Sequence, residues 1–185
     1  MFKNCIGLLD SLLLDFKGRK VVFCDLTLGN GNDLKRAFDI CDSKSTFYGF
    51  DIQPLSLKNT RKLFNDKELK NIHLILDSHE NIKEHVQEKV DLAIYNLGYL
   101  PGGNKNIVTN YNTVIASLEN LLTSLNIGGK IFITFYPGHD SGREESKYIQ
   151  EFLRSLNQKQ YEILKFDFIN QVNNPPFLIT LEKIK

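Results

Sequence analysis

A short turn rich in glycine and asparagine follows the first apolar run of the chain, in CDLTLGNGNDLKRAF at residues 24–38. Asp25 lies at the end of the apolar run. The two glycines of the turn permit a tight bend and let a ligand approach the backbone closely. A phosphate-binding P-loop would need Gly-Lys-Ser/Thr, which this turn lacks. The candidate ligand-binding residues here are Asp25, Gly29, Asn30, Gly31 and Asn32.

Polar residues also follow the next three apolar runs. Asp51 lies about 20 residues beyond the turn, where a carboxylate can accept hydrogen bonds from both hydroxyls of a ribose. The third run ends in Asp-Ser-His at 77–79, and the fourth in Asn-Leu-Gly-Tyr at 96–99. If these runs are parallel strands, their carboxyl ends meet at one edge of the sheet, where open α/β sheets bind ligands. The four polar ends therefore predict one site.

Two nucleotide cofactors fit such a site, and they differ in charge. A dinucleotide brings a pyrophosphate and favours G-x-G-x-x-G, whose third glycine lets the helix pack closely. Leu34 stands at that third position. S-adenosylmethionine has a ribose and an adenine, no phosphate, a positive sulfonium and an amino-acid tail, which suit a polar turn without lysine. The turn thus favours S-adenosylmethionine over NAD, although an isolated glycine turn can also be purely structural.

Strand and helix patterns alternate along the chain. Apolar runs rich in β-branched and aromatic residues predict strands, and amphipathic spacing predicts the intervening helices. This order favours an α/β, Rossmann-like fold: a mostly parallel seven-stranded sheet with helices on both faces, in one domain over 1–185. A short polar segment joins the last two strands, so we expect a C-terminal antiparallel hairpin, which is typical of methyltransferases. The predicted strands span 20–26, 46–52, 72–78, 90–100, 130–136, 161–169 and 177–184, and the main helices 4–16, 33–41, 57–64, 143–156 and one from 111 that closes at 128–129.

The composition is that of an ordinary globular domain, with 185 residues, 42% hydrophobic and 24% charged. A formal net charge of +1 gives no general attraction to nucleic acid, so any phosphate contacts need a local basic patch. Three cysteines without paired spacing favour a reduced, cytoplasmic location. The chain shows no export signal and no apolar run of about 18 residues, so we expect no membrane span. No metal site is expected.

Five stretches together closely resemble one bacterial family. They are DLTLGNGND, YGFDIQ, DSHENI, YNLGYLPGGNK and YPGHDSGREE, in the expected order and over nearly the whole chain. The family was first labelled as rRNA methylases and was later assigned as tRNA (mnm5s2U) methyltransferases. The resemblance implies the class I methyltransferase fold. It also implies methyl transfer from S-adenosylmethionine to the amine of 5-aminomethyl-2-thiouridine at the tRNA wobble position.

The resemblance also implies roles for individual residues. Asn30 and Asn32 would bind the methionine end of the cofactor, although many family members have histidine where this chain has Asn32. Asp51 and Gln53 would lie around the ribose. Ser78 and His79 would face the adenine, and Asp77 would serve either the site or a helix cap. Helix capping by Asp77 or Ser78, and a solvated His79, remain alternatives.

Asn96 occupies the first position of the Asn-Pro-Pro-Tyr motif of amino-group methyltransferases. Its side-chain oxygen and the Leu97 carbonyl can accept N–H bonds and so direct the amine lone pair at the methyl group. Tyr99 could stack on the base. A purely structural asparagine is the alternative. A protonated amine must first lose a proton, by desolvation beside the sulfonium or to a base. The candidates for that base are Asp25, His139 and Asp140.

The expected partner is the anticodon loop of tRNA, whose unpaired bases a small domain can read by pocket shape. Lys105 and Arg143 are the basic residues best placed to contact it. A homodimer would widen this surface, and the sequence leaves the oligomeric state open. Methylation of rRNA or of a small amine is the runner-up function. An NAD-dependent oxidoreductase and a catalytically inactive binding module are the alternatives from other classes.

Overall fold

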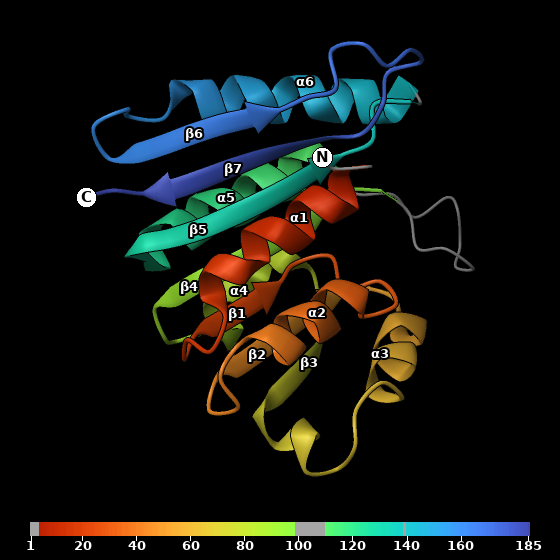
Figure 1. The fold of residues 1–185 in the computed structure, drawn as a ribbon, viewed down its shortest axis with the longest axis vertical. Coiled ribbons are helices and arrows are strands. Elements are labelled where there is room, and N and C mark those ends of the chain that lie inside the picture. The colour runs from red at the N-terminus through yellow and green to blue at the C-terminus, as the bar shows by residue number, and fades with distance from the viewer. Residues whose placement is uncertain (1–3, 99–109, 139) are drawn as a thin grey trace.

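The computed structural model describes residues 4–98, 110–138 and 140–185. Within these ranges the strands form one seven-stranded sheet in the order β3-β2-β1-β4-β5-β7-β6 (Figure 1). The pairs among β1 to β5 are parallel, and β7 is antiparallel to both of its neighbours. The strands are β1 (Val22–Asp25), β2 (Thr46–Asp51), β3 (Ile72–Leu76), β4 (Val90–Asn96), β5 (Leu125–Phe135), β6 (Tyr161–Phe166) and β7 (Phe177–Lys183).

Helices follow the strands in the alternating order that the sequence predicts. Asn4 caps the first helix, because its side chain accepts a hydrogen bond from the Gly7 backbone N–H at 2.9 Å. The helices are α1 (Cys5–Leu13), α2 (Asn32–Ile40), α3 (Pro54–Arg61), α4 (Ile82–His85), α5 (Tyr111–Ser124) and α6 (Asp140–Ser155), with 3-10 turns η1 (Leu14–Phe16), η2 (Glu68–Asn71) and η3 (His79–Asn81). Among the described residues, no helix is long and apolar enough to cross a membrane.

The sheet buries apolar side chains on both faces, as parallel sheets covered by helices do. Successive strand residues point to opposite faces, so Phe23 and Leu92 pack in the core beneath α1 and α2. Cys24 and Ala93 point the other way, into the core beneath α5 and α6. Figure 1 shows these helices on the two sides of the sheet. The predicted Rossmann-like fold with helices on both faces is confirmed.

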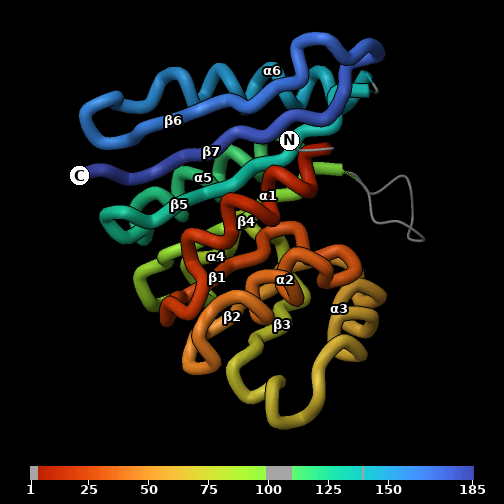
Figure 2. Tube along the Cα trace, viewed as in Figure 1, coloured from red at the N-terminus to blue at the C-terminus, as the bar shows by residue number. Residues whose placement is uncertain are grey.

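The C-terminal hairpin is also confirmed, with one topological detail that the sequence did not predict. Strand β7 inserts between β5 and β6, so the earlier strand of the hairpin forms the edge (Figure 2). The side chains of β7 are buried over most of its length, whereas those of β6 alternate between half-buried and exposed. The insertion therefore places the more apolar strand inside the sheet, where burial stabilises it most.

The predicted end of the helix that begins at 111 is wrong. Helix α5 ends at Ser124, and Leu125 already pairs with Val90 of β4. The register then shifts, because the next pair joins Leu92 to Lys130. The intervening β5 residues form a bulge, which Gly128 permits with φ 78°. The double glycine thus belongs to an irregular strand rather than to a helix terminus.

Candidate active site

From β1 the chain adds β2 and β3 on one side of the sheet, and it then adds β4 and β5 on the other side. The strand order therefore reverses between β1 and β4. Ligands of open α/β sheets bind outside the carboxyl ends of the strands at this point. Asp25 ends β1 and pairs with Ile94, two residues before the end of β4 at Asn96. The fold therefore brings the predicted cofactor turn and the predicted amine-binding residue to the same edge.

The glycine turn and the predicted ribose acid form one hydrogen-bonded unit. Gly29 and Gly31 have φ values of 53° and 77°, which favour glycine. The Gly29 N–H donates to Asp51 Oδ2 at 3.0 Å, and the Gln53 N–H donates to Asp51 Oδ1 at 2.8 Å. Asp51 is thus fixed at the end of β2 by the backbone of the turn and of the residue before α3.

Close packing between helix α2 and the sheet depends on a glycine that lies on a strand. A Cβ atom added at Gly49 of β2 would lie 2.9 Å from Leu34 Cδ1. Leu34 is fully buried, at the position where a dinucleotide-binding turn has its third glycine. A Cβ atom added at Gly31 would lie 2.5 Å from Thr60 Oγ1 of α3. Close packing here therefore involves Gly31 and Gly49, and not a third glycine at the position of Leu34 as in dinucleotide-binding turns.

Asp25 lies close enough to two other carboxylates, Asp33 and Asp51, for their charges to act on it. Asp25 is fully buried; its Oδ1 accepts from the Thr27 N–H at 3.2 Å, and its Oδ2 has no hydrogen-bond partner among the described residues. Burial, and then the charge of Asp33, raise the pKa of Asp25, with a smaller contribution from Asp51, and these effects outweigh the backbone hydrogen bonds with Thr27 and Leu34, which lower it. A buried carboxylate oxygen with no donor favours a ligand that brings a cationic or N–H group. This fits the amino group and sulfonium of S-adenosylmethionine, and it opposes a pyrophosphate.

Asp77, after β3, serves the local structure. Its carboxylate accepts hydrogen bonds from the Ser78 N–H and from Asn81 Nδ2. It also lies 2.8 Å from His85 Nε2. The hydrogen bond with His85, followed by that with Asn81, lowers the pKa of Asp77. Ser78 is the residue before η3, without a side-chain capping bond. The capping alternative thus describes Asp77 better than Ser78.

His79 is half-buried, and the alternative of a solvated first-turn histidine is wrong. Its Nε2 is buried without a hydrogen-bond partner among the described residues, and its ring lies edge-on to Tyr95 with centroids 5.9 Å apart. Desolvation lowers the pKa of His79 to about 4. His79 is therefore a neutral ring with an unused buried nitrogen at the end of β3, which suits contact with a polar aromatic group such as adenine.

The two asparagines of the turn lie in different environments. Asn30 Oδ1 accepts from Asn59 Nδ2 of α3 at 3.0 Å, so this side chain ties the turn to α3. Asn32 is the first residue of α2 and is exposed. Their contacts with the methionine end of the cofactor remain predictions.

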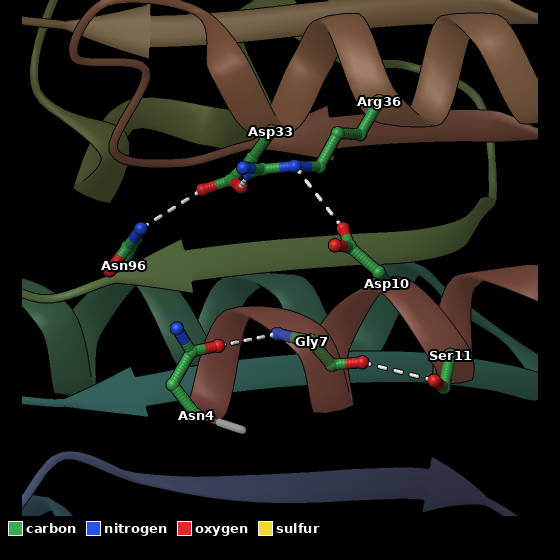
Figure 3. Close-up of polar contacts among 7 residues, drawn as sticks. All are labelled: Asn4, Gly7, Asp10, Ser11, Asp33, Arg36 and Asn96. Atoms are coloured by element: carbon green, nitrogen blue, oxygen red, sulfur yellow. Dashed lines mark hydrogen bonds and ion pairs between the residues drawn. The ribbon is translucent and has the colours of Figure 1, made fainter. Parts of the chain in front are cut away.

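Asn96 is held by several groups that sequence reasoning did not single out. Its backbone N–H donates to Thr27 Oγ1 at 2.7 Å, and its Nδ2 donates to Asp33 Oδ2 at 3.0 Å (Figure 3). Tyr136, which follows β5, shares a side-chain hydrogen bond with the same amide. The next residue, Leu97, is buried and donates its N–H to the Thr134 carbonyl at 3.0 Å. Asp33 lies in the DLTLGNGND stretch, two residues after the second glycine and in the first turn of α2. This position is the sequence feature that could have identified it as a site residue.

Several predicted residues lie elsewhere or outside the described ranges. Tyr99, His139 and Lys105 lie outside the described residues. Asp140 begins α6, is exposed and pairs with Arg143, which is itself exposed. The two partners therefore neutralise each other at the start of this helix. Among the described residues, no group of three or more His, Cys, Asp or Glu could hold a metal ion.

Comparison with known proteins extends this geometry. The model of the family described as "Putative rRNA methylase" matches residues 47–182. The chain belongs to this family. The resemblance that the sequence motifs indicated is thereby confirmed, because the matched range contains three of the four polar strand ends.

Relatives of known structure and name support the family. A crystal structure of a "putative rRNA-methylase" from Clostridium thermocellum has 35% identity and a TM-score of 0.94, covering 100% of both chains. A "putative methyltransferase" from Streptococcus mutans, in complex with SAH, has 33% identity and a TM-score of 0.88, covering 99% of both chains. The chloroplastic tRNA (mnm(5)s(2)U34)-methyltransferase of Arabidopsis thaliana is 33% identical over an alignment of 178 positions, which covers 90% of this chain and 64% of that protein.

These matches confirm the class I methyltransferase fold and the assignment to S-adenosylmethionine-dependent methyltransferases. S-adenosylmethionine is the cofactor of this family member. The carboxylates of Asp25, Asp33 and Asp51 agree with that assignment, and the NAD-dependent oxidoreductase is not supported. This chain spans 64% of the length of the curated relative, so the substrate of that relative does not transfer automatically.

Proposed function

We propose that this methyltransferase methylates the amine of 5-aminomethyl-2-thiouridine at the tRNA wobble position, giving 5-methylaminomethyl-2-thiouridine. The observation that carries the proposal is the hydrogen bond that holds Asn96 to Asp33, directly after the glycine turn, at the reversal of strand order. The Asn96 amide oxygen and the Leu97 carbonyl can accept hydrogen bonds from the N–H groups of an amine substrate. The 33% identity to a tRNA (mnm(5)s(2)U34)-methyltransferase supports this choice of amine.

Three residues would bind different parts of the cofactor. Asp51 would hold the ribose hydroxyls, Asp25 the amino group of the methionine end, and His79 the adenine. When bound, S-adenosylmethionine supplies an electrophilic methyl group on a positively charged sulfur. The Asn96 side-chain oxygen and the Leu97 carbonyl accept the N–H bonds of the amine and so direct its lone pair.

The amine must lose a proton before it attacks, because a primary alkylamine is mostly protonated at neutral pH. Of the candidate bases, Asp140 is exposed and paired with Arg143, which weakens its case. Asp25 ends β1 at the strand-order reversal, but its proposed contact with the amino group of the cofactor leaves it no free oxygen for the role of base. Desolvation beside a cation also lowers the pKa of an amine, so a dedicated base is not required.

The anticodon loop would present the substrate, because an unpaired wobble base can be splayed into a pocket. Arg143 is exposed and available for phosphate contact once Asp140 is displaced. We place the reaction in the cytoplasm on the basis of the three free cysteines. A homodimer remains a prediction.

Mass spectrometry of tRNA nucleosides tests the proposal. The protein is incubated with S-adenosylmethionine and tRNA that carries 5-aminomethyl-2-thiouridine, and the digested nucleosides are compared with an enzyme-free control. We expect the modified uridine to gain the mass of one methylene. No gain would refute the tRNA substrate, and methylation of rRNA or of the free amine in parallel reactions would support the runner-up.

A further inference from the structure

Asp33 uses its two carboxylate oxygens for different partners. It lies in the first turn of α2 and is only 6% exposed. Its Oδ1 accepts from Arg36 Nη1 at 2.5 Å, and its Oδ2 accepts from Asn96 Nδ2 at 3.0 Å (Figure 3). Arg36 in turn pairs through Nε with Asp10 Oδ1 of α1 at 3.2 Å. The network therefore connects α1 and α2 to the end of β4.

The Asp33 carboxylate fixes which end of the Asn96 amide faces it. An ionised carboxylate only accepts hydrogen bonds, whereas an amide has a donor end and an acceptor end. If the amide were flipped, its oxygen would face Asp33 Oδ2 and the hydrogen bond would be replaced by repulsion. The Asn96 backbone is fixed independently by Thr27 Oγ1. The amide oxygen is therefore directed away from Asp33.

Tyr136 does not remove this acceptor. It shares a side-chain hydrogen bond with the Asn96 amide. That hydrogen bond lowers the pKa of Tyr136, as a donor to its oxygen does, so the partner is the amide NH2, and the amide oxygen keeps its lone pairs for a substrate N–H. The Arg36 guanidinium, about one-third exposed, pairs with the Asp33 carboxylate and holds its orientation.

We propose that Asp33 is a positioning residue for methyl transfer: it orients the Asn96 amide so that its oxygen, rather than its nitrogen, faces the substrate amine. This inference rests on the proposed N-methylation, because an inward-facing acceptor helps only a substrate that carries N–H groups. Asp33 does not itself touch the reacting atoms. Its main effect falls on the rate of transfer, because Asp33 acts on the cofactor only through the charge that it exerts on Asp25.

Kinetics with two Asp33 variants test the proposal. Asp33→Asn has the same shape; with its amide oxygen facing Arg36, its new NH2 group faces Asn96 and favours the flipped amide. Asp33→Ala removes the acceptor entirely. We expect kcat on tRNA to fall about 10- to 100-fold in both variants, the cost of misorienting a reacting group. Affinity for S-adenosylhomocysteine and the thermal midpoint of Asp33→Asn remain close to those of the wild type.

Asp39→Asn is the matched control. Asp39 lies on the same helix and pairs with Lys35, but it is exposed. We expect this variant to keep wild-type kcat. A double-mutant cycle separates positioning from general damage: Asp33→Asn has no further effect on kcat once Asn96 is replaced by Ala, because the group that it orients is gone. Independent, additive losses would overturn the proposal.

A measurement without substrate keeps the inference separate from the proposed function. The side-chain amide signals of Asn96 in a proton–nitrogen NMR spectrum are identified by their loss in Asn96→Ala. We expect them to shift in Asp33→Asn and to stay in place in Asp39→Asn. If the wild type fails to methylate the tRNA, the proposed function fails while these signals still show whether Asp33 holds the amide. Unmoved Asn96 signals, or unchanged kcat in Asp33→Asn, would overturn the inference.

Discussion

The two sides of the strand-order reversal are built by different kinds of contact. On the β1–β2 side, backbone N–H groups fix the carboxylates: Thr27 binds Asp25 and Gln53 binds Asp51, each two residues away, and Gly29 binds Asp51 from 22 residues away. On the β4 side, side chains far away in the sequence fix Asn96. Its partners Thr27 and Asp33 lie 69 and 63 residues before it. The first side is thus fixed by backbone donors, and the second by side chains that the assembled fold brings to one amide.

Replacing Asn96, on the β4 side, is expected to give the largest effect: a loss of kcat without a loss of cofactor affinity. In Asn96→Ala we expect kcat to fall about 100-fold or more, because the amine loses the acceptor that directs it. Binding of S-adenosylhomocysteine, measured by calorimetry, stays close to that of the wild type. Asn71→Ala is the control, since Asn71 is a half-buried asparagine at the end of η2 whose side chain donates to the Ser43 carbonyl, away from the strand-order reversal. A large loss of cofactor affinity in Asn96→Ala would contradict the division.

Replacing Asp51 has the reverse pattern. In Asp51→Ala we expect the dissociation constant of S-adenosylhomocysteine to rise about 10- to 100-fold, the range for losing hydrogen bonds to a charged group. At saturating cofactor, kcat falls much less. Asp42→Ala is the control, because the carboxylate of Asp42 also accepts a backbone N–H, from Lys44, but at an exposed turn. If Asp51→Ala lowers kcat while the affinity is kept, the assignment of this side to binding is wrong.

The buried histidine after β3 gives a pH-dependent prediction. Because the pKa of His79 is lowered to about 4, from 6.5, the unfolded chain binds more protons than the folded one between these values. Stability is therefore fully present above pH 6.5 and falls as the pH decreases towards 4. Between pH 7 and pH 5 we expect about 2 kcal/mol more loss of unfolding free energy in the wild type than in His79→Gln.

Urea denaturation at the two pH values measures this difference. His73→Gln, at an exposed histidine, controls for the loss of one imidazole. Equal pH dependence in the wild type and in His79→Gln would show that His79 is solvated in the folded protein. The region around His79, where the adenine is proposed to bind, would then be less enclosed than the structure indicates.

Two glycines with similar backbone angles give the smallest predicted effect. Gly18 and Gly31 have φ values of 70° and 77°, but only Gly31 has a neighbour, Thr60, where a Cβ atom would go. We expect Gly18→Ala to cost about 1 kcal/mol of unfolding free energy for the left-handed backbone. Gly31→Ala costs about 1 kcal/mol more because of the clash with Thr60. Urea unfolding measures both, and equal costs would contradict the close packing of the turn.

The same contrast explains what the sequence could predict. The alternation of strands and helices, the glycine turn and Asp51 are local patterns, and the structure places them as expected. The bond from Asn96 to Asp33 requires that β4 lie beside β1, which the strand order decides and no local pattern encodes. Gly49, which accommodates Leu34, reads in the sequence as an ordinary strand residue. The start of β5 at Leu125 was missed because the bulge at Gly128 resembles a helix terminus.

A crystal structure with bound S-adenosylhomocysteine tests the central claim most directly. We predict that the ribose hydroxyls contact Asp51, that the amino group contacts Asp25, and that the sulfur faces the Asn96 amide with its oxygen turned towards the open side. A ligand whose sulfur points away from Asn96, or an Asn96 amide that presents its nitrogen to the substrate side, would contradict the account.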